Sequence, residues 1–334
     1  MDTITILLII FSLVLVFAIG AQDETMATVY GSGSLRLFWA MVMGGGLGFL
    51  GVIFLSDNVG KTIGSNLLGM DNVQKKMILA IVISTAIWLL VAIKTHLPIS
   101  TTHSVVGSVF GIAVVWAIFT EGSFQQSLNW GEMGMIMLGW VISPILGFFG
   151  VILMQKALLP FLKKKNKGFL EVEEIEGYFR YLILIAAAVN QFSRGGNDAG
   201  NAIGIFYGLV EAGSNLEDQL LVFKIVAGIL FSAGLVTYGK KLVANVGRRT
   251  TGQLRPSEAL AIVATTSLIL LLSTIFGFPV SGGHILVFAM IGYARTRGER
   301  PDRKNFRKMV SMWVLTFPIA AGLSALVYGV IYLF

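Results

Sequence analysis

Two short motifs occur once in each half of the chain. Residues 98–103 read PISTTH and residues 279–284 read PVSGGH, while GAQD at 20–23 precedes the first and GGND at 195–198 precedes the second. PVSGGH follows PISTTH by 181 residues, and GGND follows GAQD by 175 residues. The order and spacing of the motifs are therefore nearly the same in both halves. This agreement predicts an internal repeat, with one unit at 1–155 and a second at 178–334.

The composition is that of a membrane protein. Of 334 residues, 55% are hydrophobic and 13% are charged, and the mean hydropathy is +0.79, whereas soluble domains carry about 25% charged residues. The chain has no cysteine, which excludes a disulfide framework, a thiolate nucleophile and a metal site with cysteine ligands. The composition therefore predicts an all-α polytopic membrane protein.

Eight apolar runs have about the length of a membrane-spanning helix. They are 4–20, 37–55, 77–93, 104–119, 133–154, 220–238, 259–280 and 309–334. Two shorter runs, 181–189 and 285–293, adjoin glycine-rich polar motifs, so we count each as a broken helix that its neighbours complete. The sequence thus predicts ten crossings, five in each repeat.

The Lys and Arg residues orient these crossings, because cytoplasmic loops are enriched in both. With the N-terminus outside, 20 of the 25 basic residues lie in inside loops, and the opposite orientation would leave only five there. Both termini are therefore predicted to be extracytoplasmic in the cell membrane. The net charge of +7 is then a topology signal that favours contact with membrane lipid and not with nucleic acid. The segment 156–177, first basic and then acidic, is predicted to be a cytoplasmic charged linker.

Because five is an odd number, the second repeat must be inserted upside down relative to the first. Inverted-topology repeats with broken helices at the midplane are typical of secondary transporters, whose site lies where the breaks meet. In this topology the motifs at 20–23 and 98–103 lie toward the inside, and those at 195–198 and 279–284 lie toward the outside. The arrangement favours alternating access.

The motifs that begin with proline are typical of a helix start. Ser100 and Ser281 stand where an N-cap residue is expected, and the free amides of a helix start form an anion site without a basic side chain. The threonines at 101–102 add hydroxyl donors, and the glycines at 282–283 expose backbone amides. An ordinary membrane helix that happens to start with Pro-x-Ser is the alternative, but the occurrence in both repeats favours the anion site.

Acidic residues stand at the ends of apolar runs, where a charge is costly and a functional role is expected. Asp23 and Glu24 follow the first run, and Asp198 follows the short run of the second repeat. Asn197 and Asn201 beside it add neutral oxygens suited to Na⁺, while a protonatable carboxylate suits H⁺. A dianion among carboxylates requires accompanying cations, so the sequence predicts cation-coupled symport. For Glu24, a water-exposed position at the membrane edge is the alternative.

Arg194 and the three histidines each have two interpretations. Arg194 precedes Asp198 by four residues and is either the partner of an acidic residue or an interfacial anchor, and we favour the anchor. His103 and His284 end the paired motifs, and His96 lies near the first of them. Because two of the three lie in opposite halves and no cysteine is present, we expect hydrogen bonds at helix starts and not a metal site.

Together the motifs resemble the inorganic phosphate transporter (PiT) family, whose signatures in each half are a GAND-x-x-N segment and a P-[IV]-S-T-T-H segment. Residues 98–104, 195–202 and 239–241 carry the resemblance, which covers almost the whole chain. It implies inverted repeats with both termini outside, and import of inorganic phosphate (Pi) with Na⁺ or H⁺ and without a cofactor.

The motifs and the resemblance define two sets of candidate residues. The expected substrate-binding residues are Ser100, Thr101, Thr102, Asn197, Asp198, Ser281, Gly282 and Gly283. The expected coupling-cation ligands are Gln22, Asp23, Glu24, Asn197, Asp198 and Asn201. No metal other than the coupling Na⁺ is expected.

The chain departs from the family pattern in two places. Gln22 and Met26 stand where asparagines are usual, which weakens one cation site unless Glu24 compensates, and residues 282–283 are glycines in place of two threonines. Residues 29–33 resemble the sulfate permease branch of the family. Phosphate retains a proton near neutral pH and can donate a hydrogen bond to a carboxylate, whereas sulfate cannot, so the acidic motifs favour phosphate, with sulfate as the alternative.

An anion channel and a membrane enzyme are the competing function classes. Broken helices also line pores, but the inverted pairing of acidic and anion-binding motifs favours a transporter. The sequence contains no nucleophile–base set and no Walker A segment, so no enzymatic activity is predicted. A homodimer is left open.

Overall fold

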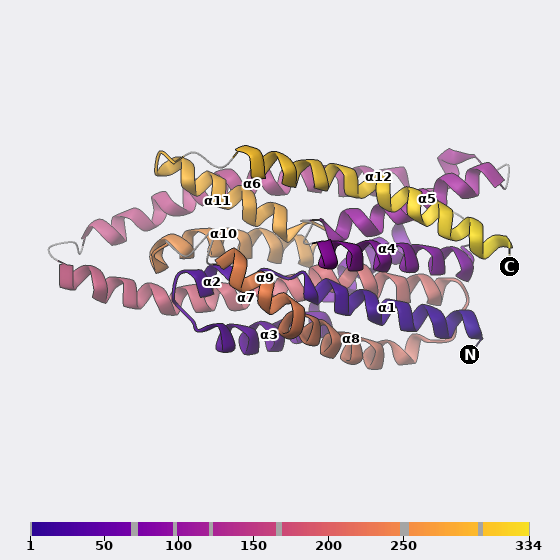
Figure 1. Cartoon of the computed structure of the whole chain (residues 1–334), viewed down its shortest axis with the longest axis horizontal. Coiled ribbons are helices and arrows are strands. Elements are labelled where there is room, and N and C mark those ends of the chain that lie inside the picture. Colours follow the sequence, from indigo (N-terminus) through magenta and orange to yellow (C-terminus); the bar gives the residue numbers. More distant parts are fainter. Residues whose placement is uncertain are drawn as a thin grey trace.

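The structure, a computed structural model, describes residues 2–67, 73–95, 99–119, 123–164, 169–247, 254–299 and 303–333. These residues form helices joined by short connections (Figure 1). The helices are α1 (Thr3–Ala21), α2 (Ala27–Gly31), α3 (Leu37–Lys61), α4 (Lys75–Thr95), α5 (Thr101–Phe119), α6 (Trp130–Lys164), α7 (Phe169–Glu211), α8 (Leu220–Gly234), α9 (Lys240–Val246), α10 (Pro256–Ile275), α11 (Gly282–Thr296) and α12 (Arg303–Leu333). A π-helical turn extends α3 (Thr62–Asn66), and another joins α8 to α9 (Leu235–Gly239).

The distribution of side chains is that of a multi-pass membrane protein. Within the described residues, eight helices are long and apolar enough to cross a bilayer. Large apolar side chains such as Phe54, Leu153 and Val314 are exposed on the outer surface, whereas Asp23 and Asp198 are buried. Apolar groups therefore face the lipid and charged groups lie in the protein interior, as expected in a membrane.

Helices α4 and α5 form a hairpin that starts and ends beside the two termini. Figure 1 shows both termini at one end of the molecule. At the start of α4, the Lys75 ammonium donates to the Asp2 carboxylate at 2.7 Å, which holds the pKa of Asp2 below its usual range. At the end of α5, the ring of Phe119 stacks on Tyr332 near the C-terminus, with centroids 6.2 Å apart.

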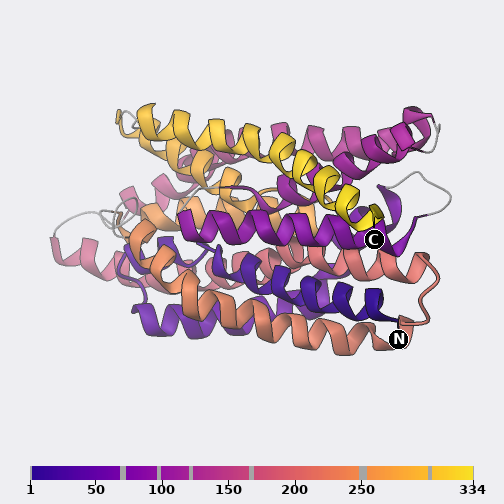
Figure 2. The ribbon, with the colours of Figure 1, turned by 45° about the vertical axis from the view of Figure 1, so that its right-hand side comes forward.

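Helices α10 and α11 form the corresponding hairpin from the opposite end, where α6 ends and α7 begins (Figures 1 and 2). The amide of Ser257, in the first turn of α10, donates to Glu176 of α7 at 2.9 Å. Arg297, just after α11, bonds Glu258 of α10 at 3.3 Å. The tips of the hairpins meet, because the Thr102 hydroxyl donates to the Val280 carbonyl at 3.3 Å.

This arrangement differs from ten independent crossings. The motifs at 98–103 and 279–284, expected on opposite sides of the membrane, come together at the hairpin tips; Pro98 itself lies outside the described residues. Hydropathy could not distinguish the two arrangements, because an apolar helix in a hairpin and one that crosses alone have the same composition.

Helix α7 also differs from expectation. The short run 181–189 and the motif at 195–198 belong to one continuous helix of 43 residues, so the break expected there is absent from the described structure. Its counterpart in the first repeat is broken, since α1 ends at Ala21 and residues 22–26 are unwound before α2. Glycine is compatible with a membrane helix where another helix approaches closely, and Gly196 packs against Leu55 of α3.

The predicted linker 156–177 is largely helical. Helix α6 extends to Lys164 and α7 begins at Phe169, so only residues 165–168, which the structure does not describe, separate them.

The two halves pack on each other through equivalent helix pairs. Helix α3 packs on α7 as α8 packs on α1, and α5 packs on α12 as α11 packs on α6. At the first pair of crossings, Gly51 of α3 faces the Phe192 carbonyl of α7, and Gly234 of α8 faces the Phe17 carbonyl of α1. A side chain at either glycine would overlap backbone atoms, so these residues set the distance between the helices.

We predict that Gly51→Ala destabilises the protein by about 1–3 kcal/mol, since an added methyl group in a closely packed contact forces the helices apart. The measurement is thermal unfolding of the purified protein in detergent. Gly46→Ala in the same helix is the matched control, because nothing lies within 4 Å of the position its Cβ would take. Equal unfolding temperatures for the two variants would contradict the role given to Gly51.

Candidate functional site

The first turns of α5 and α11 lie together at the hairpin tips. Ser100 caps α5 by accepting from the His103 amide at 3.3 Å, and Ser281 caps α11 by accepting from the His284 amide at 3.4 Å. Both serines are buried, so the positive ends of two helices meet in the protein interior. This geometry stabilises an anion without a basic side chain.

The histidines of the two motifs join the hairpins through a column of aromatic rings. His103 stacks on Trp140 of α6 and His284 contacts Trp313 of α12, with centroids 3.8 and 3.9 Å apart, and the two imidazoles lie 5.0 Å from each other. His103 Nδ1 also shares a hydrogen bond with the Ser100 hydroxyl at 2.7 Å. In the described part of the chain no three potential ligands gather as a metal site, and His96 lies outside that part.

Asp23 lies fully buried in the unwound segment between α1 and α2. Its carboxylate accepts from the amide and hydroxyl of Thr25 at 2.9 and 2.6 Å, and from Gln191 Nε2 of α7 at 2.6 Å. Gln191 Oε1 is buried and has no hydrogen-bond partner among the described residues. The Asp23 carboxylate therefore contacts the amide nitrogen of Gln191, and the amide oxygen of the same side chain is left without a partner in the described structure.

Arg194 forms ion pairs with acidic residues of both halves. Its Nη2 lies 3.4 Å from Glu24 Oε1, in the unwound segment, and its Nε donates to Asp198 one turn further along α7. The side chain is 10% exposed, so the expectation of an interfacial anchor was wrong and the alternative, a partner of acidic residues, is correct. Glu24 is likewise partly buried at 17% exposure and pairs in the interior, not at a membrane edge.

The glycines at the tip of α11 make room for this ion pair. A Cβ on Gly282 would collide with the guanidinium of Arg194. A Cβ on Gly283 would lie 3.1 Å from Glu24 Oε1. The replacement of two threonines by glycine in the second repeat therefore coincides with the position of Arg194 and Glu24.

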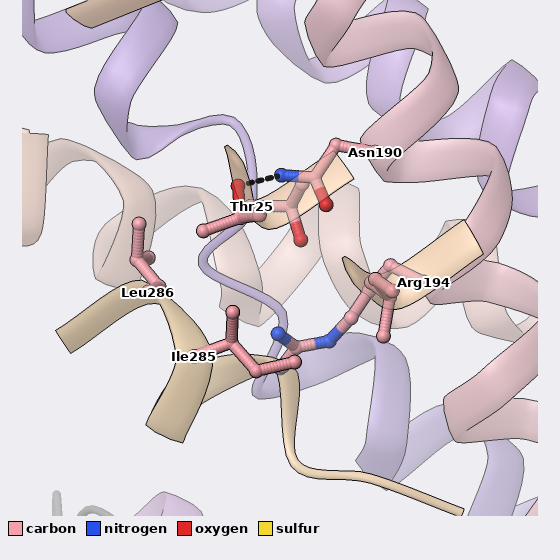
Figure 3. Close-up of a pocket in the computed structure, with 8 residues that line it drawn as sticks. Thr25, Asn190, Arg194, Ile285 and Leu286 are labelled. Atoms are coloured by element: carbon pink, nitrogen blue, oxygen red, sulfur yellow. Dashed lines mark hydrogen bonds between the residues drawn. The ribbon is translucent and has the colours of Figure 1, made fainter. Parts of the chain in front are cut away.

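A small pocket opens beside Arg194 (Figure 3). It is lined by Thr25, Asn190, Arg194, Thr266, Leu270, Gly282, Ile285 and Leu286. Across it the Asn190 amide donates to the Thr266 hydroxyl at 3.1 Å. Arg194 is the one residue with a formal charge among those that line it, so the pocket combines neutral polar groups with a guanidinium that is already paired with Glu24 and Asp198.

Several residues of this region are not among those predicted from the sequence. Asn190 and Gln191 precede Arg194 on α7, and residues 190, 194 and 198 are spaced four apart, which places them on one face of the helix. This spacing is the signal that could have revealed them. Thr25 and Thr266 carried no comparable signal, since their positions depend on the folding of separate segments around α7.

Asn197 forms hydrogen bonds to residues 278 and 280, in the segment that connects α10 to α11. Its amide nitrogen donates to the Phe278 carbonyl at 3.0 Å and to the Thr274 hydroxyl at 3.2 Å, while its oxygen accepts from the Val280 amide at 3.2 Å. In contrast, the Asn201 amide bonds carbonyls of its own helix and leaves its buried Oδ1 without a partner in the described structure.

Of the expected cation ligands, Asp23, Glu24 and Asp198 lie around Gln191 and Arg194 of α7. Gln22 does not bond to this group, because its amide donates to the Leu89 carbonyl of α4 at 3.2 Å. Met26, where the family pattern has an asparagine, is fully buried among apolar side chains.

In this polytopic membrane protein, two hairpin tips meet beside buried charges. This combination is typical of a secondary transporter. Residues 19–324 match the model of the phosphate transporter family, PHO4, and the chain belongs to this family. The resemblance inferred from the motifs is thereby confirmed, and the protein belongs to a family of transporters, not of enzymes.

The chain is similar to relatives and to a solved structure over nearly its full length. It is 26% identical to "Putative phosphate permease TK2061" of Thermococcus kodakarensis, with 99% of this chain and 98% of that protein covered. It is 25% identical to "Inorganic phosphate transporter 2-1, chloroplastic" of Arabidopsis thaliana, with 95% and 70% covered. A solved structure of "The sodium-dependent phosphate transporter" has the same fold, with a TM-score of 0.87 at 24% identity and with 99% of this chain and 100% of that chain covered.

We predict that Asn197→Ala destabilises the α10–α11 hairpin, because it leaves the buried Val280 amide and the Phe278 carbonyl unpaired. Each such group costs about 1–3 kcal/mol. Thermal unfolding in detergent measures the loss. Asn58→Ala is the control, since the exposed Asn58 side chain donates to a single carbonyl, that of Ile275. If the two variants lose the same stability, Asn197 does not hold the hairpin.

Proposed function

We propose that this protein is a secondary active symporter that imports inorganic phosphate by alternating access, coupled to Na⁺ or H⁺. The observation that carries the proposal is the meeting of two helix starts, from hairpins of opposite direction, beside buried carboxylates. Membership of the phosphate transporter family and similarity to phosphate permeases and transporters support the choice of substrate.

The anion is proposed to bind at the first turns of α5 and α11. There the backbone amides and the hydroxyls of Ser100, Thr101 and Thr102 face those of Ser281 and its two glycines. Asp198 at the edge of this region accepts a hydrogen bond from the protonated oxygen of phosphate, while Asn197 keeps the tip of α11 in place. Helix dipoles of both halves then stabilise one oxyanion.

Inverted repeats at 1–155 and 178–334 are proposed to produce the alternating access. Equivalent helix pairs at the contacts between the halves support the repeat, and hairpins that enter from opposite ends support the inversion. Movement of one hairpin relative to the other would open the site to one end at a time. The basic residues support a cytoplasmic position for 156–177 and extracytoplasmic termini.

The coupling cation is proposed to bind at Asp23. The Gln191 side chain that bonds this carboxylate through its amide nitrogen has a buried Oε1 without a partner in the described residues, so this oxygen is available as a second ligand. Na⁺ at this position neutralises Asp23 next to the anion, which links occupation of one site to occupation of the other. Protonation of Asp23 would have the same effect on charge, so H⁺ is the alternative coupling ion.

Sulfate transport is the second candidate function. A guanidinium, an amide and hydroxyls gather beside α11, and groups of this kind donate to an oxyanion that has no proton of its own. Under this alternative, the carboxylates contact cations only.

The decisive experiment is uptake into proteoliposomes with labelled phosphate and labelled sulfate, with Na⁺ and pH gradients imposed separately. We expect accumulation of phosphate driven by one of the gradients, saturation with substrate, and weak competition by sulfate, because a fully deprotonated anion facing Asp198 meets a like charge. Accumulation of sulfate without phosphate would replace the proposal by the sulfate alternative. Flux without a coupling gradient and without saturation would indicate a channel.

We predict that Asp23→Asn abolishes accumulation driven by the Na⁺ gradient. Loss of one partner of a buried charge pair costs about 2–5 kcal/mol, so Na⁺ affinity should fall by about tenfold or more. Uptake at graded Na⁺ concentrations measures the effect. Asp57→Asn is the matched control, because Asp57 also accepts hydrogen bonds from two partners, Tyr207 and Lys224, but lies outside the site. Unaltered Na⁺-driven accumulation by the Asp23 variant would place the cation elsewhere.

A further inference from the structure

The buried charges of the site are unequal in number. The Arg194 guanidinium forms ion pairs with two carboxylates, those of Glu24 and Asp198, and a third buried carboxylate, that of Asp23, is bonded to Gln191 on the same helix. Asp23 is bonded by neutral donors only, Thr25 and Gln191, whereas Glu24 and Asp198 share Arg194. Two of the three acidic residues among the expected cation ligands are therefore already paired with a positive charge that belongs to the chain.

We propose that Arg194 is a resident cation of the transport site. Its guanidinium takes the place of one coupling cation between Glu24 of the first repeat and Asp198 of the second, so each cycle moves one cation fewer than the acidic residues could hold. This inference rests on the proposed symport function and adds to it the stoichiometry of coupling and the residue that sets it.

The geometry of the ion pair supports this role. A mobile cation at a symporter site bridges ligands of both repeats, and Arg194 makes the same bridge, from Asp198 on its own helix to Glu24 in the unwound segment. The side chain is 10% exposed, so water does not screen the interaction substantially. An uncompensated buried carboxylate is strongly unfavourable, and Arg194 removes that cost permanently for both residues.

Two of the departures from the family pattern lie beside this ion pair. Gly282 leaves the space that Arg194 fills, and Gly283 leaves space for Glu24. Met26 adds no oxygen where the pattern has an asparagine, and Gln22 is bonded to α4. A site that contains its own positive charge needs fewer oxygen ligands for mobile cations, which accounts for these substitutions together.

A resident cation also changes the state of the empty transporter. A mobile cation leaves with the substrate, and its carboxylates must then be neutralised again before the empty protein can reorient. Arg194 stays, so Glu24 and Asp198 remain paired throughout the cycle. Asp23 is then the one acidic residue of this cluster that exchanges its positive partner.

The test compares the wild type with Arg194→Gln in proteoliposomes, with the number of cations per phosphate obtained from the membrane potential at which net flux reverses. We expect the variant to move one more cation per phosphate than the wild type, with a steeper dependence of uptake on Na⁺. Arg194→Lys keeps the charge and should keep the wild-type ratio. Arg194→Gln combined with Asp198→Asn restores the net charge of the site and should return the ratio toward the wild-type value.

Lys224→Gln is the matched control, because Lys224 is a buried basic residue paired with Asp57 outside the site. Its cation ratio should equal that of the wild type. An unchanged ratio in Arg194→Gln overturns the proposal, and if phosphate affinity at saturating Na⁺ also falls, Arg194 is a ligand of the anion instead.

A binding measurement keeps the proposal testable where Arg194→Gln transports poorly. Na⁺ that binds the folded state raises the unfolding temperature. We therefore expect Na⁺ to stabilise Arg194→Gln more than the wild type, and Arg194→Lys no more than the wild type. Equal stabilisation of all three overturns the proposal. Absence of phosphate uptake by the wild type under every gradient would instead refute the symport function itself, so the two failures are distinguishable.

Discussion

Burial of carboxylates inside a membrane protein is the constraint on which the rest of this structure depends. A charge that leaves water for the bilayer interior requires a donor or a counter-charge. Asp23 obtains donors from Thr25 and from Gln191, and Arg194 pairs with Glu24 and Asp198. Because Asp23 and Glu24 come from the first half and their partners on α7 from the second, these bonds join the unwound segment of one half to an intact helix of the other.

The positive ends of α5 and α11 complement this acidic cluster. Both hairpins place a serine-capped helix start in the interior, and in the proposed function the oriented amides stabilise the anion in place of solvent. Close packing brings the parts together. Gly282 admits the guanidinium of Arg194 to the first turn of α11, and Gly51 lets α3 approach the backbone of α7. Small residues at these contacts thus determine how near the opposite charges lie.

Much of the fold could be predicted from the chain alone, because hydropathy and helix-start signals depend on local residues. The runs at 4–20 and 309–334 correspond to α1 and α12, and Ser281 caps α11 as expected. Two predictions failed for a common reason. The glycine-rich motif at 195–198 was interpreted as a break, but contact with α3 keeps it helical, and Arg194 was placed at the interface, but its partner Glu24 is distant in sequence. Both errors concern contacts between segments that local patterns do not encode.

The sequence by itself determined the class of the protein, its repeated motifs and the residue types of the site, since composition and spacing constrain these directly. Only the tertiary structure decided that α4 with α5 and α10 with α11 turn back as hairpins, and that Gln191 and Arg194 serve the carboxylates of the first half. The physical reason is that an apolar helix has the same hydropathy whether it crosses the membrane or returns. Likewise, a charged residue acquires its role from the partner that folding brings to it.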